Sequence, residues 1–520
     1  MKIKSVKVSN FRVPGEALLK LGDMTVLIGA NGSGKTALLL AIARFFSKGK
    51  TMNAPNFGKR GLPIKVTVTA EGDGGKTAEV TREWRPDKKS GKAVSAGYAS
   101  GGRTADGLDG FLAARVVYVP AGHELTGSVR GGRDTLLQSL VNNVAGNQRK
   151  GARRGEARQA AKASLSHVEG AINKKLGARD GVGYAPNIGV RLRFGDPTER
   201  TGLEMDIIDL EACEKLDYAH VGHGARRALH MAALEADADI LAEGGSVDEG
   251  NTDMATLYII DEPELHQHPQ RQDLIFGALR RLSEKPSSQV IYATHSPHFV
   301  ELGTRMEIRK VRRTAAGISI NAASADGEAV TGGVVRPIGE AIFANGAVLV
   351  EGHHDEEIMK AILRATPHGE KSLMDALAGK EISVVDCHSK HNIVHYYRIL
   401  HPLGIKCFVV WDGDMGMEKG PALDQAKRKN GELFEMLDED PKKAETMGSG
   451  SGDCMVGDIW ACFGHDSPSH FADCFGLSPK TLERRIKGGV DISRLLDKDR
   501  LSQSEFYKRA LPSLCRALVE

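Results

Sequence analysis

The residue types with the clearest chemical meaning lie between Met24 and Phe46. This segment reads MTVLIGANGSGKTALLLAIARFF: a short apolar run, a glycine-rich loop, then apolar residues at helical spacing. Glycines let backbone N–H groups turn toward phosphate oxygens, and the N-terminus of the following helix faces the same anion. The pattern predicts a P-loop, with Lys35 on the β- and γ-phosphates and Thr36 on Mg²⁺. The other phosphate-binding candidates are Asn31, Gly32 and Gly34.

Two carboxylates follow an apolar run in residues 257–269, LYIIDEPELHQHP. A buried strand would deliver Asp261 and Glu262 to its C-terminal end. One carboxylate can enter the shell of Mg²⁺, and the other can orient or deprotonate the attacking water. A further strand, QVIY, ends before Thr294-His295-Ser296-Pro297. His295 is either a satisfied polar residue at a strand end or a contact to the γ-phosphate, and in this setting we favour the contact.

Two weaker signals accompany these motifs. Gly222 and Gly224 flank His223 at the start of an Ala/Leu-rich helix, which makes an N-terminus suited to an anion. Arg12 follows an alternating strand at residues 2–8 and precedes the P-loop. Arg12 is either an ordinary surface charge or a contact to the nucleotide, and both interpretations stay open.

The elements between these motifs indicate a mixed α/β chain. Residues 64–84 predict a hairpin around Gly-Asp-Gly-Gly, and residues 115–120 predict another buried strand. Residues 147–176 are helical and basic, including Arg149, Lys150, Arg153, Arg154 and Arg158. They form either a solvated helix face or an inserted arm that contacts a nucleic-acid backbone.

Carboxylates also mark the second half of the chain. Apolar strands at 346–351, 382–386 and 407–411 alternate with helices, which predicts a small parallel sheet. Glu351 and the Asp412/Asp414 pair would then gather at its C-terminal edge. Crowded carboxylates repel one another unless a cation neutralises them, and oxygen ligands suit Mg²⁺ or Mn²⁺. Two such ions could clamp the attacking and leaving oxygens of a phosphodiester.

The motifs of the first half resemble those of an ABC-type ATPase of the branch shared by chromosome-maintenance and RecF-like proteins. GANGSGKT matches its Walker A motif, LYIIDEPE its Walker B motif with catalytic Glu262, and THSP its switch-histidine motif. GHGARR stands where the branch has its signature motif, usually Ser-Gly-Gly. The resemblance implies that two chains pair head to tail and sandwich ATP, with Gly222 and Gly224 on the partner's nucleotide. No sustained heptad run is present, so long coiled-coil arms are not expected.

The second half resembles a Toprim domain, and the combination resembles the OLD (overcoming lysogenisation defect) endonucleases. This implies a DNA nuclease dependent on Mg²⁺ or Mn²⁺ and attached to a dimerising ATPase; relatives act against phage, sometimes with a partner protein or a retron. Asp355 stands where the family has a second Glu, with Glu356 as an alternative. Lys390 is the candidate for stabilising transition-state charge. The implied metal ligands are Glu351, Asp355, Asp412, Asp414 and Asp458, with Asp386 less favoured than Asp458.

Other histidines and cysteines carry weaker signals. His353, His354, His388, His391 and His395 are either proton shuttles or phosphate contacts near this edge, or ordinary polar surface. Cys454, Cys462, His465, His470 and Cys474 lack a tight Cys-x-x-Cys pair, so zinc is not expected.

Length, charge and cysteine content limit the possible domain organisation and location of the protein. The chain has 520 residues, a formal net charge of +3 and 7 cysteines at scattered positions. We therefore expect a cytoplasmic protein of several domains, without a membrane span, signal peptide or disulfide scaffold. The predicted domains are 1–340 (ABC-type ATPase, with a helical insertion at about 135–180), 341–465 (Toprim, Rossmann-like) and 466–520 (helical tail).

Two alternatives to an endonuclease stay open. One is a RecF/SMC-like DNA-repair ATPase whose carboxylates bind DNA through metal without cutting it. The other is topoisomerase or primase chemistry. A topoisomerase needs a strand-attacking tyrosine in a separate domain, for which the chain has no room, and a primase would incorporate nucleotides.

Overall fold

The computed structural model describes most of both halves of the chain. Asp414, Asp458 and the basic residues Arg149, Lys150 and Arg153 lie outside the described residues, as do the side chains of Asp412, Arg154 and Arg158. The described residues are 2–47, 51–52, 56–59, 61–72, 75, 77–86, 93–100, 114–121, 154–177, 183–194, 203–216, 221–242, 255–300, 306–324, 338, 341–412, 420–436, 454–456, 459–462, 472–503, 511–515 and 518.

The chain divides into two compact units, which are described separately. The first consists of Met1–Val300 and Arg305–Ile320, and the second of Glu301–Thr304 and Asn321–Glu520. The predicted domain limits at residues 340 and 465 stay predictions. The predicted α/β fold is confirmed, because both units contain parallel sheets with helices between their strands.

A six-stranded sheet forms the centre of the first unit. Five of its strands pair in parallel, from β14 through β3, β13 and β12 to β8, so their C-terminal ends meet at one edge. The strand order is β15 (Gly317–Ser324), β14 (Met306–Thr314), β3 (Met24–Ile28), β13 (Ser288–Ala293), β12 (Thr256–Asp261) and β8 (Arg115–Val119).

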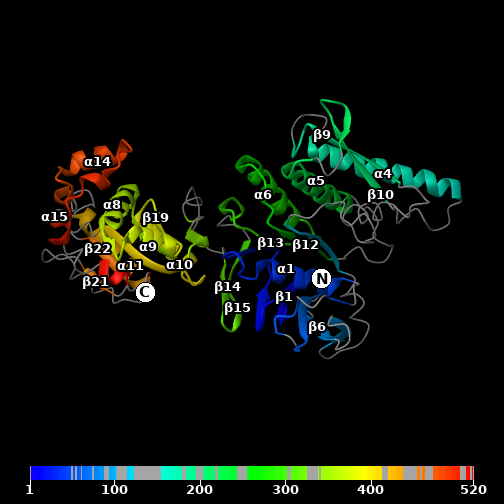
Figure 1. Ribbon diagram of the computed structural model, residues 1–520, viewed down its shortest axis with the longest axis horizontal. Helices are drawn as coiled ribbons and strands as arrows, with labels where there is room; N and C mark the ends of the chain where they lie inside the picture. Colours follow the sequence, from blue (N-terminus) through cyan, green and yellow to red (C-terminus); the bar gives the residue numbers. More distant parts are fainter. Residues whose placement is uncertain are drawn as a thin grey trace. The chain divides into compact units, whose positions relative to one another are not determined.

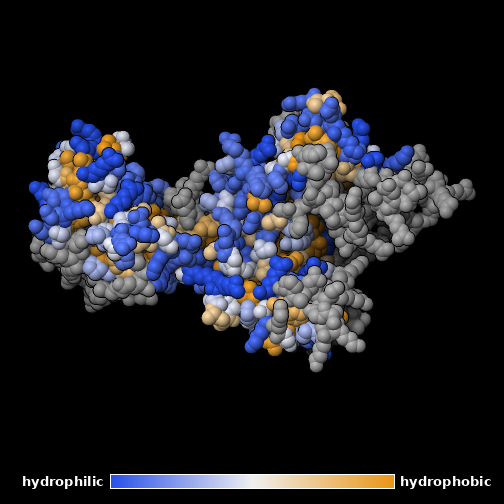
Figure 2. Space-filling view, viewed as in Figure 1, coloured by the Kyte–Doolittle hydropathy of each residue, from blue (hydrophilic) through white to orange (hydrophobic). Residues whose placement is uncertain are grey.

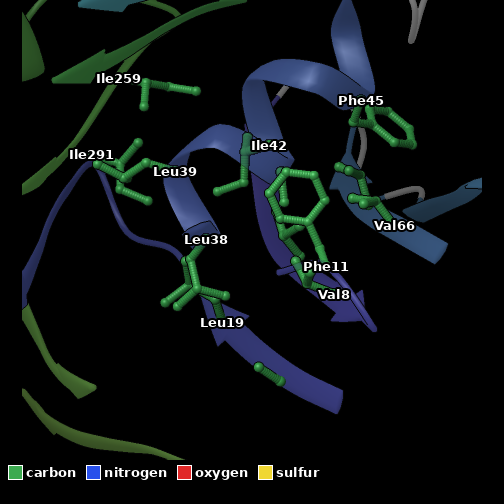
Figure 3. Packing of buried hydrophobic residues seen from close by; sticks show 14 of the residues in the cluster. Val8, Phe11, Leu19, Leu38, Leu39, Ile42, Phe45, Val66, Ile259 and Ile291 are labelled. Atoms are coloured by element: carbon green, nitrogen blue, oxygen red, sulfur yellow. The ribbon is translucent and has the colours of Figure 1, made fainter. Parts of the chain in front are cut away.

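A second, antiparallel sheet packs on helix α1 (Lys35–Phe46), which follows β3. Figure 3 shows Leu38, Leu39 and Ile42 of this helix between residues of both sheets. The predicted hairpin at 64–84 is confirmed as β5 and β6. The strand order of this sheet is β2 (Glu16–Lys20), β1 (Lys2–Ser9), β5 (Ile64–Glu71), β6 (Thr77–Pro86), β7 (Ala93–Ser100) and β4 (Thr51–Met52).

The buried side chain of Arg82 binds carbonyl oxygens at the C-terminal end of α1. Its Nη1 donates to the carbonyl oxygens of Arg44, Phe45 and Ser47 at 2.9, 2.8 and 2.5 Å. These carbonyls belong to the last turn, where the helix offers no partner of its own. The guanidinium also lies 4.7 Å from the ring centroid of Trp84, which adds a cation–π contact. The antiparallel sheet thus fixes the end of the helix that begins at the P-loop.

The further α-helices in the described part of this unit are α4 (Arg154–Leu176), α5 (His223–Ala242) and α6 (Pro269–Ser283). Helix α4 lies against α5 and β9 (Figure 1), where β9 (Ile188–Phe194), β10 (Leu203–Asp209) and β11 (Glu214–Leu216) form a small sheet. Its buried residues follow helical spacing, which accounts for this packing. They are Leu165, Val168, Ile172 and Leu176.

The second unit contains the parallel sheet predicted from residues 346–411. Strand β16 pairs in parallel with both β19 and β20, β20 pairs in parallel with β22, and β21 is antiparallel to β22. The order is β19 (Ile382–Asp386), β16 (Gly346–Val350), β20 (Lys406–Asp412), β22 (Ile459–Cys462) and β21 (Cys454–Val456). The longer helices of this unit are α8 (His353–Ala365), α9 (Leu373–Gly379), α10 (Lys390–Leu400) and α11 (Pro421–Met436).

Short C-terminal elements complete this second core. Leu482, Ile486, Ile492 and Leu501 join the same apolar cluster as Ile358 of α8, so the described part of the tail packs onto the sheet unit. The short C-terminal elements are η6 (Ala472–Phe475), α14 (Pro479–Lys487), η7 (Ile492–Leu495), α15 (Lys498–Gln503) and α16 (Leu511–Leu514). Between α8 and α9 lie two short strands, β17 (Pro367–His368) and β18 (Lys371–Ser372).

The visible face of both units is largely hydrophilic (Figure 2). Among the described residues, no helix combines the length and apolar character that crossing a membrane requires.

Candidate functional site

The P-loop connects β3 to α1 at the C-terminal edge of the central sheet. Gly29, Gly32 and Gly34 have φ of 144°, 73° and 112°, in the region that disfavours other residues. The ammonium of Lys35 donates to the carbonyl oxygens of Gly29 at 2.7 Å and Ala30 at 3.1 Å. The loop therefore has the backbone geometry that the sequence predicts for phosphate binding.

Thr36 and Asp261 meet across the sheet. The Thr36 hydroxyl lies 3.3 Å from Oδ1 of Asp261, the last residue of β12. Burial raises the pKa of the Asp261 carboxyl, while the hydrogen bond from Thr36 opposes that shift. Burial likewise lowers the pKa of Lys35, and the charges of Glu262 and Asp261 act in the opposite sense. One hydroxyl and one carboxylate thus lie together beside a desolvated ammonium, a set suited to a nucleotide phosphate and its Mg²⁺.

Glu262 follows β12 with a φ of 49°, which is uncommon for a residue with a side chain. Its N–H donates to the carbonyl of Ala293 on the neighbouring strand at 2.9 Å. Buried Arg227 of α5 donates to the carbonyl oxygen of Asp261 at 2.7 Å and to that of Pro120 at 3.3 Å. Desolvation lowers the pKa of Arg227 to about 10. The main chain at Glu262 is therefore held by the neighbouring strand β13 on one side and by the Arg227 side chain of α5 on the other.

His295 lies just beyond β13, with an exposed ring. Its backbone N–H donates to Oε1 of Glu264 at 2.6 Å, a short charge-assisted bond. Burial lowers the pKa of the imidazole, and the positive charge of Lys35 acts in the same direction. The N–H of Thr294 donates to the carbonyl of Leu27 at 3.1 Å, so His295 follows at the edge where β3 leads into the P-loop. A contact of His295 with the γ-phosphate stays a prediction.

Gly222 and Gly224 lie at the start of α5, and their surroundings differ. Among the described residues, a Cβ on Gly222 would meet nothing within 4 Å, whereas a Cβ on Gly224 would lie 2.9 Å from the carbonyl oxygen of His266. Gln267 also donates its side-chain amide to the Gly224 carbonyl at 2.9 Å. Packing within the chain therefore explains the glycine at position 224, and Gly222 is left open toward its surroundings.

Arg12 has a φ of 57° and contacts Asn56 twice. Its N–H donates to the Asn56 carbonyl at 2.7 Å, and its Nε donates to Oδ1 at 3.2 Å. The pKa of nearby Tyr118 is raised to about 12, first by burial and then by the charge of Asp261, whereas Arg12 lowers it. Arg12 and Asp261 thus both act on Tyr118, and a contact of Arg12 with nucleotide stays a prediction.

The second candidate site lies at the C-terminal edge of the other parallel sheet. The register pairs Val350 with both Asp386 and Val410, so Glu351 follows β16 at the level where β19 and β20 end. Asp412 is the last residue of β20 and lies within this edge by its backbone. The predicted convergence of strand ends is therefore present in the described residues.

Lys390 is buried with 4% of its side chain exposed, and its Nζ lies 3.9 Å from Oε2 of Glu351. It is the first residue of α10, capped by Ser389, whose hydroxyl accepts from the N–H of Asn392. A buried cation beside a carboxylate at a strand edge is an arrangement suited to a phosphate group.

Asp355 and Asp386 make contacts of their own at this edge. Oδ2 of Asp355 accepts the N–H of Gly352 at 2.8 Å, which closes the first turn of α8. The two oxygens of Asp386 contact His388, one accepting its N–H at 2.6 Å and the other lying 3.0 Å from Nδ1.

The histidines form further groups. Nε2 atoms of His391 and His395 lie 3.1 Å apart on one face of α10. Among the described residues, His353, Glu356 and Glu357 place one ligand atom each within 4.8 Å of one another. Lys360 lies 2.9 Å from Glu356 and 3.2 Å from Glu357, so its ammonium offsets one of the two negative charges.

Family comparisons agree with this division into two sites. The model described as AAA ATPase domain matches residues 1–95 and 152–300, which include the P-loop, Asp261 and His295. The model described as Overcoming lysogenization defect protein-like, TOPRIM domain matches residues 342–414, which include Glu351, Lys390 and Asp412. Together the two models match more than half of the chain. The chain therefore consists of an AAA ATPase domain followed by an OLD-like TOPRIM domain.

Two curated relatives match most of the length of this chain. It is 22% identical over 476 residues to the Old nuclease of Escherichia phage P2, covering 80% of this chain and 77% of that protein. It is 23% identical over 477 residues to the OLD nuclease of Thermus scotoductus, covering 82% and 85%.

Among solved structures, matches include an Smc head bound to the C-winged helix domain of ScpA (TM-score 0.44, 14% identity). The match covers 63% of this chain and 98% of that one. The SMC head domain from Thermotoga maritima has a TM-score of 0.33 at 16% identity, covering 62% and 100%.

No role was predicted from the sequence for two polar residues of the ATPase site. Glu264 contacts the backbone of His295, and Arg227 contacts the backbone of Asp261. Glu264 lies in the DEPE segment and Arg227 in the GHGARR segment. Their partners are main-chain atoms, whose position cannot be predicted from residue types. Only the second glutamate of DEPE, close to the Walker B carboxylates, could have suggested a role.

Proposed function

We propose that this protein is a DNA endonuclease of the OLD family that depends on a divalent metal and is regulated by ATP in its ATPase domain. The observation that carries the proposal is the buried Lys390 ammonium 3.9 Å from Glu351, at the edge where β20 ends in Asp412. A cation beside carboxylates can stabilise the negative charge that a phosphodiester gains during cleavage. Relatives named as nucleases support this assignment.

The donor set of this edge fits a hard divalent cation, because Glu351 and the strand-terminal Asp412 offer only oxygen ligands. We propose Glu351, Asp355, Asp412 and Asp414 as ligands of Mg²⁺ or Mn²⁺, with Asp458 as a further ligand. Bound there, the metal would polarise the phosphodiester and activate water. Lys390 would contribute its positive charge to the same phosphate.

The ATPase site is proposed to act through dimer geometry. Asn31, Gly32, Gly34, Lys35 and Thr36 would bind the phosphates of ATP, and Asp261 would share Mg²⁺ with Thr36. Glu262 would orient the attacking water, and His295 would contact the γ-phosphate. Gly222, Gly224 and Arg12 would complete the nucleotide site, the two glycines from the partner subunit of a head-to-tail homodimer. ATP would then regulate cleavage without stoichiometric coupling.

Plasmid nicking tests this proposal. Purified wild-type protein is compared with Asp412→Ala and Lys35→Ala in Mg²⁺ or Mn²⁺, with and without ATP, and ATP turnover is measured in parallel. We expect Asp412→Ala to lose cleavage and keep ATP turnover, because the two residues lie in different units. We expect Lys35→Ala to lose turnover and to change only the ATP dependence of cleavage.

Other outcomes point elsewhere. Intact plasmid in every lane, with ATP turnover present, would support a RecF/SMC-like ATPase that binds DNA without cutting it. Loss of ATP turnover in Asp412→Ala would contradict separate sites. We further propose a role in cytoplasmic anti-phage defence, alone or with a partner protein or retron. Phage plating on cells that express wild-type or Asp412→Ala protein tests that role.

A further inference from the structure

We infer that Glu264 is a positioning residue for His295: its carboxylate holds the backbone of residues 294–297, the switch loop, through the His295 N–H. The inference rests on the proposed role of His295 at the γ-phosphate and extends it to a group that touches no nucleotide. It assigns a distinct task to the second glutamate of the DEPE segment.

Contacts at the carboxyl ends of β12 and β13 carry the argument. The two strands are parallel neighbours with Asp261 opposite Ala293, so the turn after β12 lies beside His295. Glu264 in that turn accepts the His295 N–H at 2.6 Å. A bond this short from a backbone donor to a carboxylate fixes the main chain at the residue that must aim its ring.

The ring of His295 has no such anchor of its own. It is exposed and makes no side-chain hydrogen bond with the residues that the structure describes. Its direction therefore follows from the backbone on either side. Ser296, the next residue, is also held, because its hydroxyl lies 2.6 Å from Oε1 of Gln272 on α6.

The carboxyl group of Glu264 is buried as well as hydrogen-bonded to His295. Oε2 of Glu264 is buried and has no hydrogen-bond partner within the described part of the chain, and the same is true of Nε of Arg227. Burial raises the pKa of Glu264 and the charge of Glu262 adds to this, whereas hydrogen bonds from the His295 backbone and the Thr294 side chain oppose it. The bond to His295 is therefore made by a largely buried carboxyl group, where surrounding water does not weaken it.

Contacts from α5 hold both ends of the turn that carries Glu264. Arg227 donates to the carbonyl of Asp261 before this turn, and Gln267 after it donates to the carbonyl of Gly224. Since Arg227 lies one turn from Gly224 on α5, these two contacts join the start of that helix to the turn. A displacement of α5 would be transmitted to His295 through Glu264.

A double-mutant cycle tests the inference on the full-length protein. Glu264→Ala, Glu264→Gln, His295→Ala and the double variant Glu264→Ala/His295→Ala are compared with wild type, and Glu284→Ala serves as an exposed control. Affinities for ADP and for a non-hydrolysable ATP analogue with Mg²⁺ are measured with ATP turnover and the thermal unfolding midpoint.

We expect Glu264→Ala to lower kcat by about 10- to 100-fold and to reduce the preference for the ATP analogue over ADP. Glu264→Gln keeps an oxygen acceptor for the His295 N–H and is expected to stay within about threefold of wild type. The double variant should be no worse than His295→Ala, because both changes remove the same contact. If Glu264→Ala fails to fold, Glu264→Asp, which is one methylene too short, replaces it in the cycle.

Three results would overturn the inference: wild-type behaviour of Glu264→Ala, a Glu264→Gln protein as impaired as Glu264→Ala, or additive losses in the double variant. Equal impairment by Gln would mean that the carboxylate itself is required. If wild-type protein does not hydrolyse ATP, only the proposed hydrolysis is rejected. The ratio of the affinities for the ATP analogue and for ADP still reports the position of His295, because it requires no hydrolysis.

Discussion

The Thr36 hydroxyl lies 3.3 Å from Oδ1 of Asp261, although 225 positions separate the two residues in the chain. The strands β3, β13 and β12 are successive neighbours in the central sheet, so the ends of β3 and β12 are brought to the same edge. A hydroxyl and a carboxylate at this distance can share one Mg²⁺ ion.

Removing this hydroxyl should weaken binding of MgATP in particular. We expect Thr36→Val, which preserves volume, to lower MgATP affinity about tenfold or more and to leave metal-free ATP binding within about threefold. Thr36→Ser keeps the hydroxyl and should bind as wild type does. Titration with a fluorescent ATP analogue, with Mg²⁺ and with EDTA, measures the difference. Equal losses with and without Mg²⁺ would contradict a role in metal binding.

Two glycines of one segment should respond differently to a methyl group. Gly224→Ala places a Cβ 2.9 Å from the His266 carbonyl, so we expect a loss of about 1–3 kcal/mol of unfolding free energy, despite alanine's higher helix propensity. Gly222→Ala meets no atom of the described part of the chain within 4 Å and should unfold as wild type does. If Gly222 faces a partner's nucleotide, that variant should lose ATP turnover and ATP-dependent dimerisation. Similar unfolding curves for both variants would argue against the packing at Gly224.

Lys390 should affect cleavage and leave the ATPase unchanged. We expect Lys390→Met to reduce plasmid nicking by about 10²–10³-fold, as for other groups that stabilise charge in a transition state. ATP turnover should stay at the wild-type level, because Lys390 and the P-loop lie in different units. The exposed Lys371→Met provides a matched control. Nicking at the wild-type rate by Lys390→Met would remove this residue from the proposed mechanism.

His230 on α5 should make the first unit sensitive to acid. Burial, followed by the charge of Arg227, lowers the pKa of His230 to about 3 in the folded protein, against about 6.5 unfolded. The unfolded chain then binds the extra proton first as pH falls. Stability is therefore fully present above about pH 6.5 and is lost progressively toward about pH 3.

At pH 5 this single group should cost about 2 kcal/mol of unfolding free energy. The variant His230→Gln lacks the titration, so its unfolding midpoint should fall less steeply than that of wild type between pH 7.5 and 5. Urea unfolding at several pH values compares the two slopes. Parallel curves would show that His230 does not contribute to acid sensitivity.

Most of the secondary structure at both sites could be predicted from local pattern. Alternation predicted β1, continuous apolar runs predicted β3, β12 and β16, and glycine spacing predicted the P-loop. These features depend on residues that are close in sequence, so that a window of a few residues contains the information. The same patterns placed carboxylates at strand ends, as the register of β16 and β20 bears out for Glu351 and the backbone of Asp412.

Side-chain contacts to main-chain atoms could not be predicted from local sequence pattern. Glu264 holds the N–H of His295, and Arg227 holds the carbonyl of Asp261. Every residue except proline has the same backbone N–H and carbonyl groups. The residue types therefore do not indicate which N–H or carbonyl a side chain will bind. Lys390 was a candidate by motif, but its burial beside Glu351 depends on how α10 meets β16.

The sequence by itself determined the residue types: the glycine loop with Lys35 and Thr36, the paired carboxylates, and apolar strands that must be buried. Tertiary structure alone decided which of these meet. The order of parallel strands brings Asp261 to Thr36 and Glu264 to His295, and the approach of α5 to the turn at His266 requires a glycine at 224. The physical reason is that hydrogen bonds and close packing act over a few ångströms, whereas the segments they join are set side by side by the sheet as a whole.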